Sequence, residues 1–103
     1  MIDQDSRVTG QVLTSKIDVL SPSDAVEQLM SWGRQRVSRY VSICNAHVVV
    51  SAAQDPSYEK IINDSDMATP DGAPVAWLLR QIGFYDQRRI SGPDLTWSLC
   101  ERC

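Results

Sequence analysis

Residues 67–82 read MATPDGAPVAWLLRQI, and this stretch decides the fold class. Met67 to Thr69 predicts a very short strand that runs directly into Pro70-Asp71-Gly72. The apolar residues Val75, Leu78, Leu79 and Ile82 then recur at helical spacing and form one face of a strong amphipathic helix, which we expect to end at Gly83. A strand followed at once by a helix is typical of α/β units.

The residues before this stretch repeat the same order of elements. Residues 37–44 alternate as a strand would, and Asn45 ends that strand and caps a helix carrying Val48, Val49 and Ala52. Asp55-Pro56 begins a second short helix, which Asn63-Asp64 ends. Further upstream, Ser21-Pro22 begins a helix that we expect to close at Gly33. Residues 11–20 predict an extended segment or a hairpin-like arm, preceded by a frayed segment over residues 1–10.

Downstream, Arg89 to Ser91 predict a third short strand, Gly92-Pro93-Asp94 a turn, and Leu95, Ser98 and Leu99 the beginning of a helix. Strands that alternate with helices predict an α/β fold, a Rossmann-like parallel sheet flanked by helices, here as an incomplete domain. In such sheets ligands bind beyond the carboxyl ends of the strands. The segments 44–47, 70–72 and 91–94 therefore matter most.

Composition narrows the function classes. The chain has 103 residues with 43% hydrophobic and 22% charged residues, no apolar run of membrane-spanning length and no secretory signal, so we expect a cytoplasmic protein. A net charge of −3 argues against a nucleic-acid partner. Cys44, Cys100 and Cys103 lack zinc-ligand partners, and Cys100 and Cys103 form a C-x-x-C at the wrong place for a redox motif, so we expect buried or idle thiols.

The three strand-to-helix segments place Asn45, Asp71 and the Ser91-Gly92 turn at one expected crevice. Asp71 is the best candidate for a general base, and Arg88 or Arg89 could pair with diphosphate oxygens. Purely structural roles compete: Asn and Asp are favoured helix caps, Pro-Asp-Gly is an ordinary turn, and either arginine could lie in solvent. His47 lies near the expected crevice, and a first-turn helix residue is the preferred interpretation over a site role. We assign no site role to the tryptophans, interpret Asp64-Ser65-Asp66 as a solvated turn and predict no metal.

Three segments together resemble the successive motifs of the WecG/TagA/CpsF family, glycosyltransferase family 26. They are Asn45-Ala46-His47, Thr69-Pro70-Asp71-Gly72 and residues 89–95 (RISGPDL). The likeness covers residues 11–103. It implies an inverting, metal-independent enzyme without cofactor, which uses a UDP-sugar donor and a polyprenyl-diphosphate-linked sugar acceptor in cell-surface polysaccharide biosynthesis. It implies Asp71 as catalytic base, Asn45 as a substrate-positioning residue and Arg89 as an anion-binding residue. We include Gly72, Gly92 and Asp94 in the substrate-binding set.

Two departures from the family pattern affect these expectations. Some members have Thr two places before the Asn, where this chain has Ile43. Members also run to about twice this length, and their second half supplies nucleotide-binding surface and, in some, a membrane-directed tail. We therefore expect weak or no activity from this chain alone, peripheral association with the inner face of the membrane through the absent part, and possible homo-oligomers. The alternative is an inactive remnant or interaction domain; another nucleotide-binding α/β family would show a Gly-rich phosphate loop, which is absent.

Overall fold

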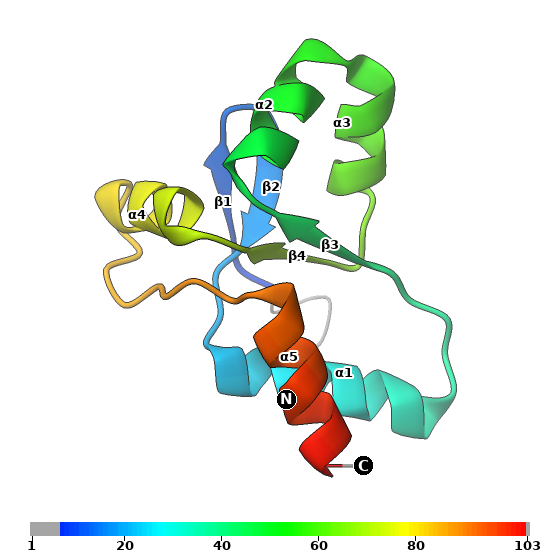
Figure 1. Ribbon diagram of the computed structural model, residues 1–103. Coiled ribbons are helices and arrows are strands. Elements are labelled where there is room, and N and C mark those ends of the chain that lie inside the picture. Colours follow the sequence, from blue (N-terminus) through cyan, green and yellow to red (C-terminus); the bar gives the residue numbers. More distant parts are fainter. Residues whose placement is uncertain (1–6, 103) are drawn as a thin grey trace.

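The computed structural model describes residues 7–102, and Figure 1 shows two small sheets with helices around them. β1 (Thr9–Val12) and β2 (Ser15–Asp18) form an antiparallel hairpin. Of the two structures predicted for this region, the hairpin-like arm is therefore the one that forms. β3 (Val41–Cys44) and β4 (Met67–Pro70) form a parallel pair. The predicted α/β class is therefore confirmed. Of the segment expected to be frayed, residues 1–6 lie outside the described part, whereas Arg7 pairs with Asp18 and β1 begins at Thr9.

Side-chain caps start most of the helices where the sequence predicts them. Ser21 Oγ accepts the N–H of Asp24, and Asn45 Oδ1 accepts the N–H of Val48. The helices within residues 7–102 are α1 (Pro22–Gln35), α2 (Ala46–Gln54), α3 (Pro56–Asn63), α4 (Ala73–Gln81) and α5 (Gly92–Arg102). The predicted end of α1 at Gly33 is wrong, because α1 continues to Gln35 and Arg36 takes the left-handed conformation that closes it.

Three predicted elements differ from the structure. The strand expected from residue 37 begins only at Val41, where pairing with β4 starts. The third strand expected at residues 89–91 does not form, because Ile90 N–H donates a single bond of 2.8 Å to Pro70 O and no ladder follows. The turn expected at residues 92–94 is the first turn of α5, since Ser91 Oγ accepts the N–H of Asp94 at 3.1 Å and caps the helix.

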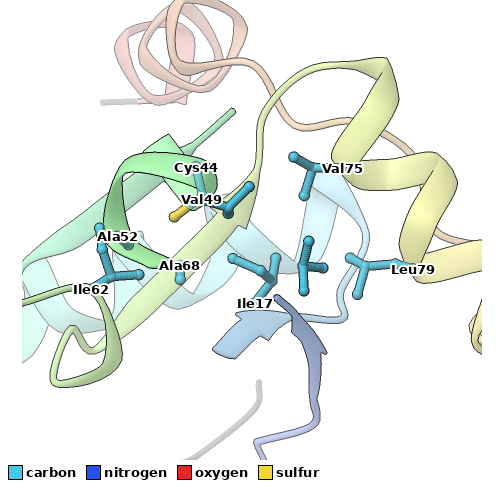
Figure 2. Packing of buried hydrophobic residues seen from close by; sticks show 9 residues of the cluster. Ile17, Cys44, Val49, Ala52, Ile62, Ala68, Val75 and Leu79 are labelled. Atoms are coloured by element: carbon cyan, nitrogen blue, oxygen red, sulfur yellow. The ribbon is translucent and has the colours of Figure 1, made fainter. Parts of the chain in front are cut away.

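The parallel pair separates two groups of buried side chains, because successive residues of a strand point to opposite faces. One face of β4 contributes Ala68 to a core shared with the hairpin, α2, α3 and α4, shown in Figure 2. The other face contributes Met67 to a core shared with α1, Ile90 and α5. The first core comprises Val12, Ile17, Cys44, Val49, Ala52, Ile62, Ala68, Val75 and Leu79. Both faces of β4 are covered, which explains why the whole strand is buried.

A buried carboxylate ties the hairpin to the free edge of β4. Asp18 Oδ2 accepts the N–H of Ala68 at 2.6 Å, so a side chain occupies the place of a third strand at this position. Arg7 holds the same carboxylate through two bonds of 2.6 and 2.9 Å, and also donates to Ser65 O. Paired and hydrogen-bonded in this way, the buried charge is compensated. Asp18 and Arg7 thus fix the strand that leads to residue 71.

Candidate functional site

The register of the parallel pair brings Asn45 and Asp71 together. Cys44 lies beside Pro70, so the two strands end side by side and the next residues, Asn45 and Asp71, leave the sheet at neighbouring points. The N–H of Asp71 donates to Cys44 O at 2.9 Å, which extends the pairing by one residue. A Cβ placed on Gly72 would lie 4.0 Å from Asn45 Cβ. Residues 45, 71 and 72 therefore lie together at the carboxyl ends of β3 and β4, as the sequence predicts. This end of the strand pair is called the sheet edge below.

The carboxylate of Asp71 is available for a ligand. Its side chain is half-buried, and within residues 7–102 it accepts no hydrogen bond and forms no ion pair, whereas Asp18, Asp55 and Asp66 all have partners. The backbone around it is held rigidly, because its N–H is shared between Cys44 O and Thr69 O. An acceptor oxygen without an internal partner can act as a general base once a substrate hydroxyl lies within hydrogen-bond reach.

Cys44, directly behind this edge, is unsuited to act as a nucleophile. Burial, followed by the negative charges of Asp18 and Asp71, raises the pKa of the Cys44 thiol to about 12. The thiolate is the reactive form of cysteine, so this thiol is inert near neutral pH. The predicted buried, idle thiol is confirmed for Cys44, while Cys100 is exposed. Of the Cys44 and Asp71 side chains, Asp71 is thus the one with acid–base chemistry to offer near neutral pH.

Gly72 gives the start of α4 an unusual backbone. Its φ of 96° and ψ of 148° belong to a region that side chains other than glycine's rarely adopt. No side chain caps α4, whereas Asn45 caps α2. The N–H groups at the beginning of α4 therefore receive no side-chain acceptor and stand next to Asn45 and Asp71.

The side chain of Asn45 has an amide oxygen that caps α2 and an amide nitrogen without a partner in residues 7–102. Its Oδ1 is committed to the N–H of Val48 at 2.9 Å, so the capping role that competed with function is real. The side chain is nevertheless exposed, and its amide nitrogen has no acceptor within the described residues. Asn45 can hence cap α2 through its oxygen while it donates to a ligand through its nitrogen. His47 is exposed in the first turn of α2.

Arg89 and Asp94 lie on the other side of β4. They line a small cavity of about 80 Å³ between α1 and α5, together with Pro22, Val26, Ile90, Ser91, Leu95 and Ser98. Neither Asn45 nor Asp71 belongs to its lining. Gly92 is closer to the expected edge, because a Cβ on it would lie 3.6 Å from Ile43 of β3. The structure therefore brings together residues 45, 71 and 72, with Gly92 nearby, and holds Arg89 and Asp94 in a separate hollow.

Several residues that support this edge gave no signal in the sequence. Asp18 follows a buried isoleucine in a short strand and looks like a solvent-facing residue, and Arg7 lies in the stretch expected to be frayed. Gln87 bonds to both the N–H and the carbonyl oxygen of Leu20, and so anchors the segment that leads to Ile90. Such contacts join residues far apart in the chain, and no local pattern reports them.

Two further findings concern ligands and membranes. Within residues 7–102 there is no group of three or more His, Cys, Asp or Glu side chains that could hold a metal ion. Asp64 pairs with Lys60, and Asp66 accepts the N–H of Tyr40, so both acids of the Asp64-Ser65-Asp66 cluster have structural partners. In the same described range, none of the helices has the length and apolar character to cross a bilayer.

Comparison with known proteins agrees with the family resemblance of the sequence. The pattern of the glycosyl transferase WecG/TagA/CpsF family matches residues 10–103. A Bacillus spizizenii protein named N-acetylglucosaminyldiphosphoundecaprenol N-acetyl-beta-D-mannosaminyltransferase is 32% identical over 68 residues. That match covers 66% of this chain but only 26% of the relative, so the chain spans a small part of the relative's length. On the family match over nearly its whole length, the chain belongs to the WecG/TagA/CpsF family of glycosyltransferases.

Proposed function

We propose that this chain contributes the catalytic base of an inverting glycosyltransferase. The enzyme transfers an N-acetylmannosaminyl or related hexosyl group from a UDP-sugar to a polyprenyl-diphosphate-linked sugar in cell-surface polysaccharide biosynthesis, at the cytoplasmic face of the membrane. Family membership and the name of the Bacillus relative support the reaction class. The observation that carries the assignment is the unpartnered carboxylate of Asp71 at the end of a parallel strand pair, beside Asn45.

The chemistry needs one proton acceptor. As the acceptor hydroxyl oxygen bonds to the anomeric carbon of the donor sugar, its proton passes to a carboxylate oxygen of Asp71. The bond from that carbon to the UDP oxygen breaks on the opposite face, and its electron pair leaves with the diphosphate, so the configuration inverts. Asp71 then releases the proton to solvent. Because base and leaving group lie on opposite faces of the sugar, no covalent enzyme intermediate forms.

The other residues of the edge position the substrates and stabilise charge. Asn45 donates its amide N–H groups to a sugar hydroxyl, and the uncapped N–H groups beyond Gly72 favour negative charge next to them. Arg89 serves as an anion-binding residue for diphosphate, with Gly92 and Asp94 completing the substrate-binding set from the α5 side. Arginine gives this charge stabilisation without a metal ion. Arg89 is exposed, and no hydrogen bond or ion pair of its side chain is found within residues 7–102.

A transfer assay tests the proposal. The chain, alone and extended to the length of its relatives, is incubated with UDP-N-acetylmannosamine and a short-chain polyprenyl-diphosphate N-acetylglucosamine, and UDP release and product are measured. We expect little turnover from the chain alone and robust turnover from the extended protein. If Asp71→Asn leaves the turnover of the extended protein unchanged, Asp71 is not the base. An extended protein that folds but never transfers sugar from any UDP donor supports the inactive-remnant alternative.

A further inference from the structure

We propose that the side of β3 facing away from β4 binds a further parallel strand, supplied by the chain that follows α5 in the extended protein. Within residues 7–102, β3 pairs with β4 on one side. Cys44 O accepts the N–H of Asp71 on that side, and the backbone groups of successive strand residues point to alternate sides. The N–H and C=O groups of Val41 and Ile43 therefore point away from β4. They form what is called the open side of β3 below.

The two strands of the pair differ in burial. All four residues of β4 are buried, whereas the first three residues of β3 are half-buried, although two of these are apolar. The outer side of β4 is also occupied already. Asp18 Oδ2 accepts the N–H of Ala68 there, and Ile90 donates its N–H to Pro70 O. Strands of parallel sheets are normally buried, so β3 is the strand that lacks a neighbour.

The handedness of crossovers selects where the next strand lies. The connection from β3 to β4 runs through α2 and α3, which pack on one face of the pair, whereas α5 packs on the other face (Figure 1). Crossovers between parallel strands are right-handed in about 98% of cases. Two right-handed crossovers on opposite faces advance across the sheet in opposite directions. Because the first leads from β3 to β4, a crossover through α5 leads from β4 back past β3, to the open side.

The packing of α5 agrees with this direction. A Cβ placed on Gly92, at the start of α5, would lie 3.6 Å from Ile43 Cγ2. Val41 packs against the buried cluster that contains Leu95 of α5. The helix thus lies over β3, as a connection that passes β3 requires. The matched part is 26% of the Bacillus relative, so a protein of that length has ample chain for further strands.

A strand on the open side would complete the surroundings of Asn45, a step that rests on the proposed function. β3 would then lie between two strands that are reached by crossovers on opposite faces. In open α/β sheets ligands bind at such a switch point, beyond the carboxyl ends of the strands. We therefore expect the residue that follows the new strand to lie beside Asn45 and to contact the same substrate as Asp71.

Amide hydrogen exchange, measured by NMR, tests the proposal in the chain and in the extended protein of the transfer assay. The N–H groups of Ser42 and Cys44 point toward β4 and should be protected in both proteins. Those of Val41 and Ile43 should exchange quickly in the chain. In the extended protein they should exchange at least about a hundredfold more slowly, when each rate is divided by that of Ser42 in the same protein.

Proline substitutions provide a matched pair of variants. Ile43→Pro removes an N–H group on the open side, whereas Ser42→Pro removes one that points toward β4. Proline is tolerated in a strand where its missing N–H has no partner. Ser42→Pro should therefore lower the urea midpoint of both proteins, and Ile43→Pro should lower that of the extended protein more than that of the chain.

Three results would overturn the proposal. Val41 and Ile43 could exchange as fast in the extended protein as in the chain, or Ile43→Pro could lower both midpoints equally. Protection of these two N–H groups that rises with the concentration of the chain alone would assign the open side to a second copy. None of these measurements needs turnover, so a protected open side in an inactive extended protein separates failure of the proposed function from failure of this inference.

Discussion

The starts of α4 and α5 use the same residue types in a different order. Pro70-Asp71-Gly72 leads into α4 from a paired strand, whereas Ser91 leads into α5, whose first turn contains Gly92, Pro93 and Asp94. At α4 the aspartate precedes the helix and its N–H completes the strand pairing. At α5 the aspartate is inside the helix, and its N–H bonds to Ser91 Oγ.

This difference concerns the backbone of each aspartate, because no donor to either carboxylate is found within residues 7–102. Asp94 lies in the first turn of α5, where a negative charge is stabilised by the helix dipole and serves the helix itself. Asp71 has no partner in the described residues and stands beside the uncapped start of α4. Two similar sequence motifs thus place one aspartate inside the first turn of a helix and the other between a strand and a helix.

Replacement of each aspartate by asparagine should produce the largest difference in kcat between the two helix starts. In the protein extended to the length of its relatives, Asp71→Asn keeps the shape of the side chain but removes the proton acceptor, so we expect kcat to fall by about 10²- to 10⁴-fold. Asp94→Asn should lower kcat far less. Steady-state turnover at fixed donor and acceptor checks both variants, and a urea titration checks that the fold is intact. Similar reductions of kcat in the two variants would show that the two helix starts do not differ in their contribution to catalysis.

The elements on either side of Asn45 and Asp71 were predictable because their signals are local. Three helix starts are predictable from side chains that commonly cap helices, namely Ser21, Asn45 and Asp55. In the structure each of these side chains caps the expected helix. The short strand before Pro70 is recognisable because a glycine and a helix follow at once. These signals also placed residues 45 and 71 at a common edge, since parallel strands end together.

The errors fall where distant contacts decide the outcome. The segment at residues 89–91 has the composition of a strand, but Asp18 already occupies the N–H of Ala68 on that edge of β4, so only Ile90 pairs. The place of Arg89 depends on how α1 and α5 pack, and that packing has no counterpart in the local sequence. Whether Arg89 reaches a diphosphate stays a prediction.

The two described cysteines sharpen the comparison between the rigid sheet edge and α5. Because the thiolate reacts and the pKa of Cys44 is raised to about 12 by burial and by Asp18 and Asp71, alkylation at pH 8 should be at least about a hundredfold slower at Cys44 than at Cys100. Mass spectrometry of iodoacetamide adducts, with Cys103→Ser to remove the third thiol, measures both rates. Comparable rates would mean that the sheet edge opens readily.

The same thiol makes stability depend on pH in a defined direction. The pKa of the Cys44 thiol in the folded state lies above its ordinary value of 9.0, so the folded state holds the proton more tightly than the unfolded chain does. The resulting stabilisation is complete below pH 9.0 and is lost as the pH rises toward 12. Denaturant titrations between these limits should show a smaller decline in Cys44→Ala than in the parent chain.

Exchange of the two glycines tests the backbone at each helix start. Gly72→Ala forces alanine into a φ of 96°, which should reduce the free energy of unfolding by about 1–3 kcal/mol. Gly92→Ala meets Ile43 at an ordinary contact distance of 3.6 Å without positive φ, so it should be neutral or stabilise by up to about 1 kcal/mol. Urea denaturation of the two variants compares them. A harmless Gly72→Ala would show that the turn after Asp71 is freer than its backbone angles indicate.

Loss of the α5 cap should have the smallest effect. Ser91→Ala removes the Oγ acceptor of the Asp94 N–H and should lower the free energy of unfolding by about 1 kcal/mol. The equivalent change on the sheet side, Asn45→Ala, removes the cap of α2 at a similar structural cost and also removes the amide that we assign to substrate. Ser91→Ala should thus cost stability alone, whereas Asn45→Ala should cost stability and raise KM in the extended enzyme. If both variants change KM equally, the α5 start belongs to the substrate site as closely as the β3 end does.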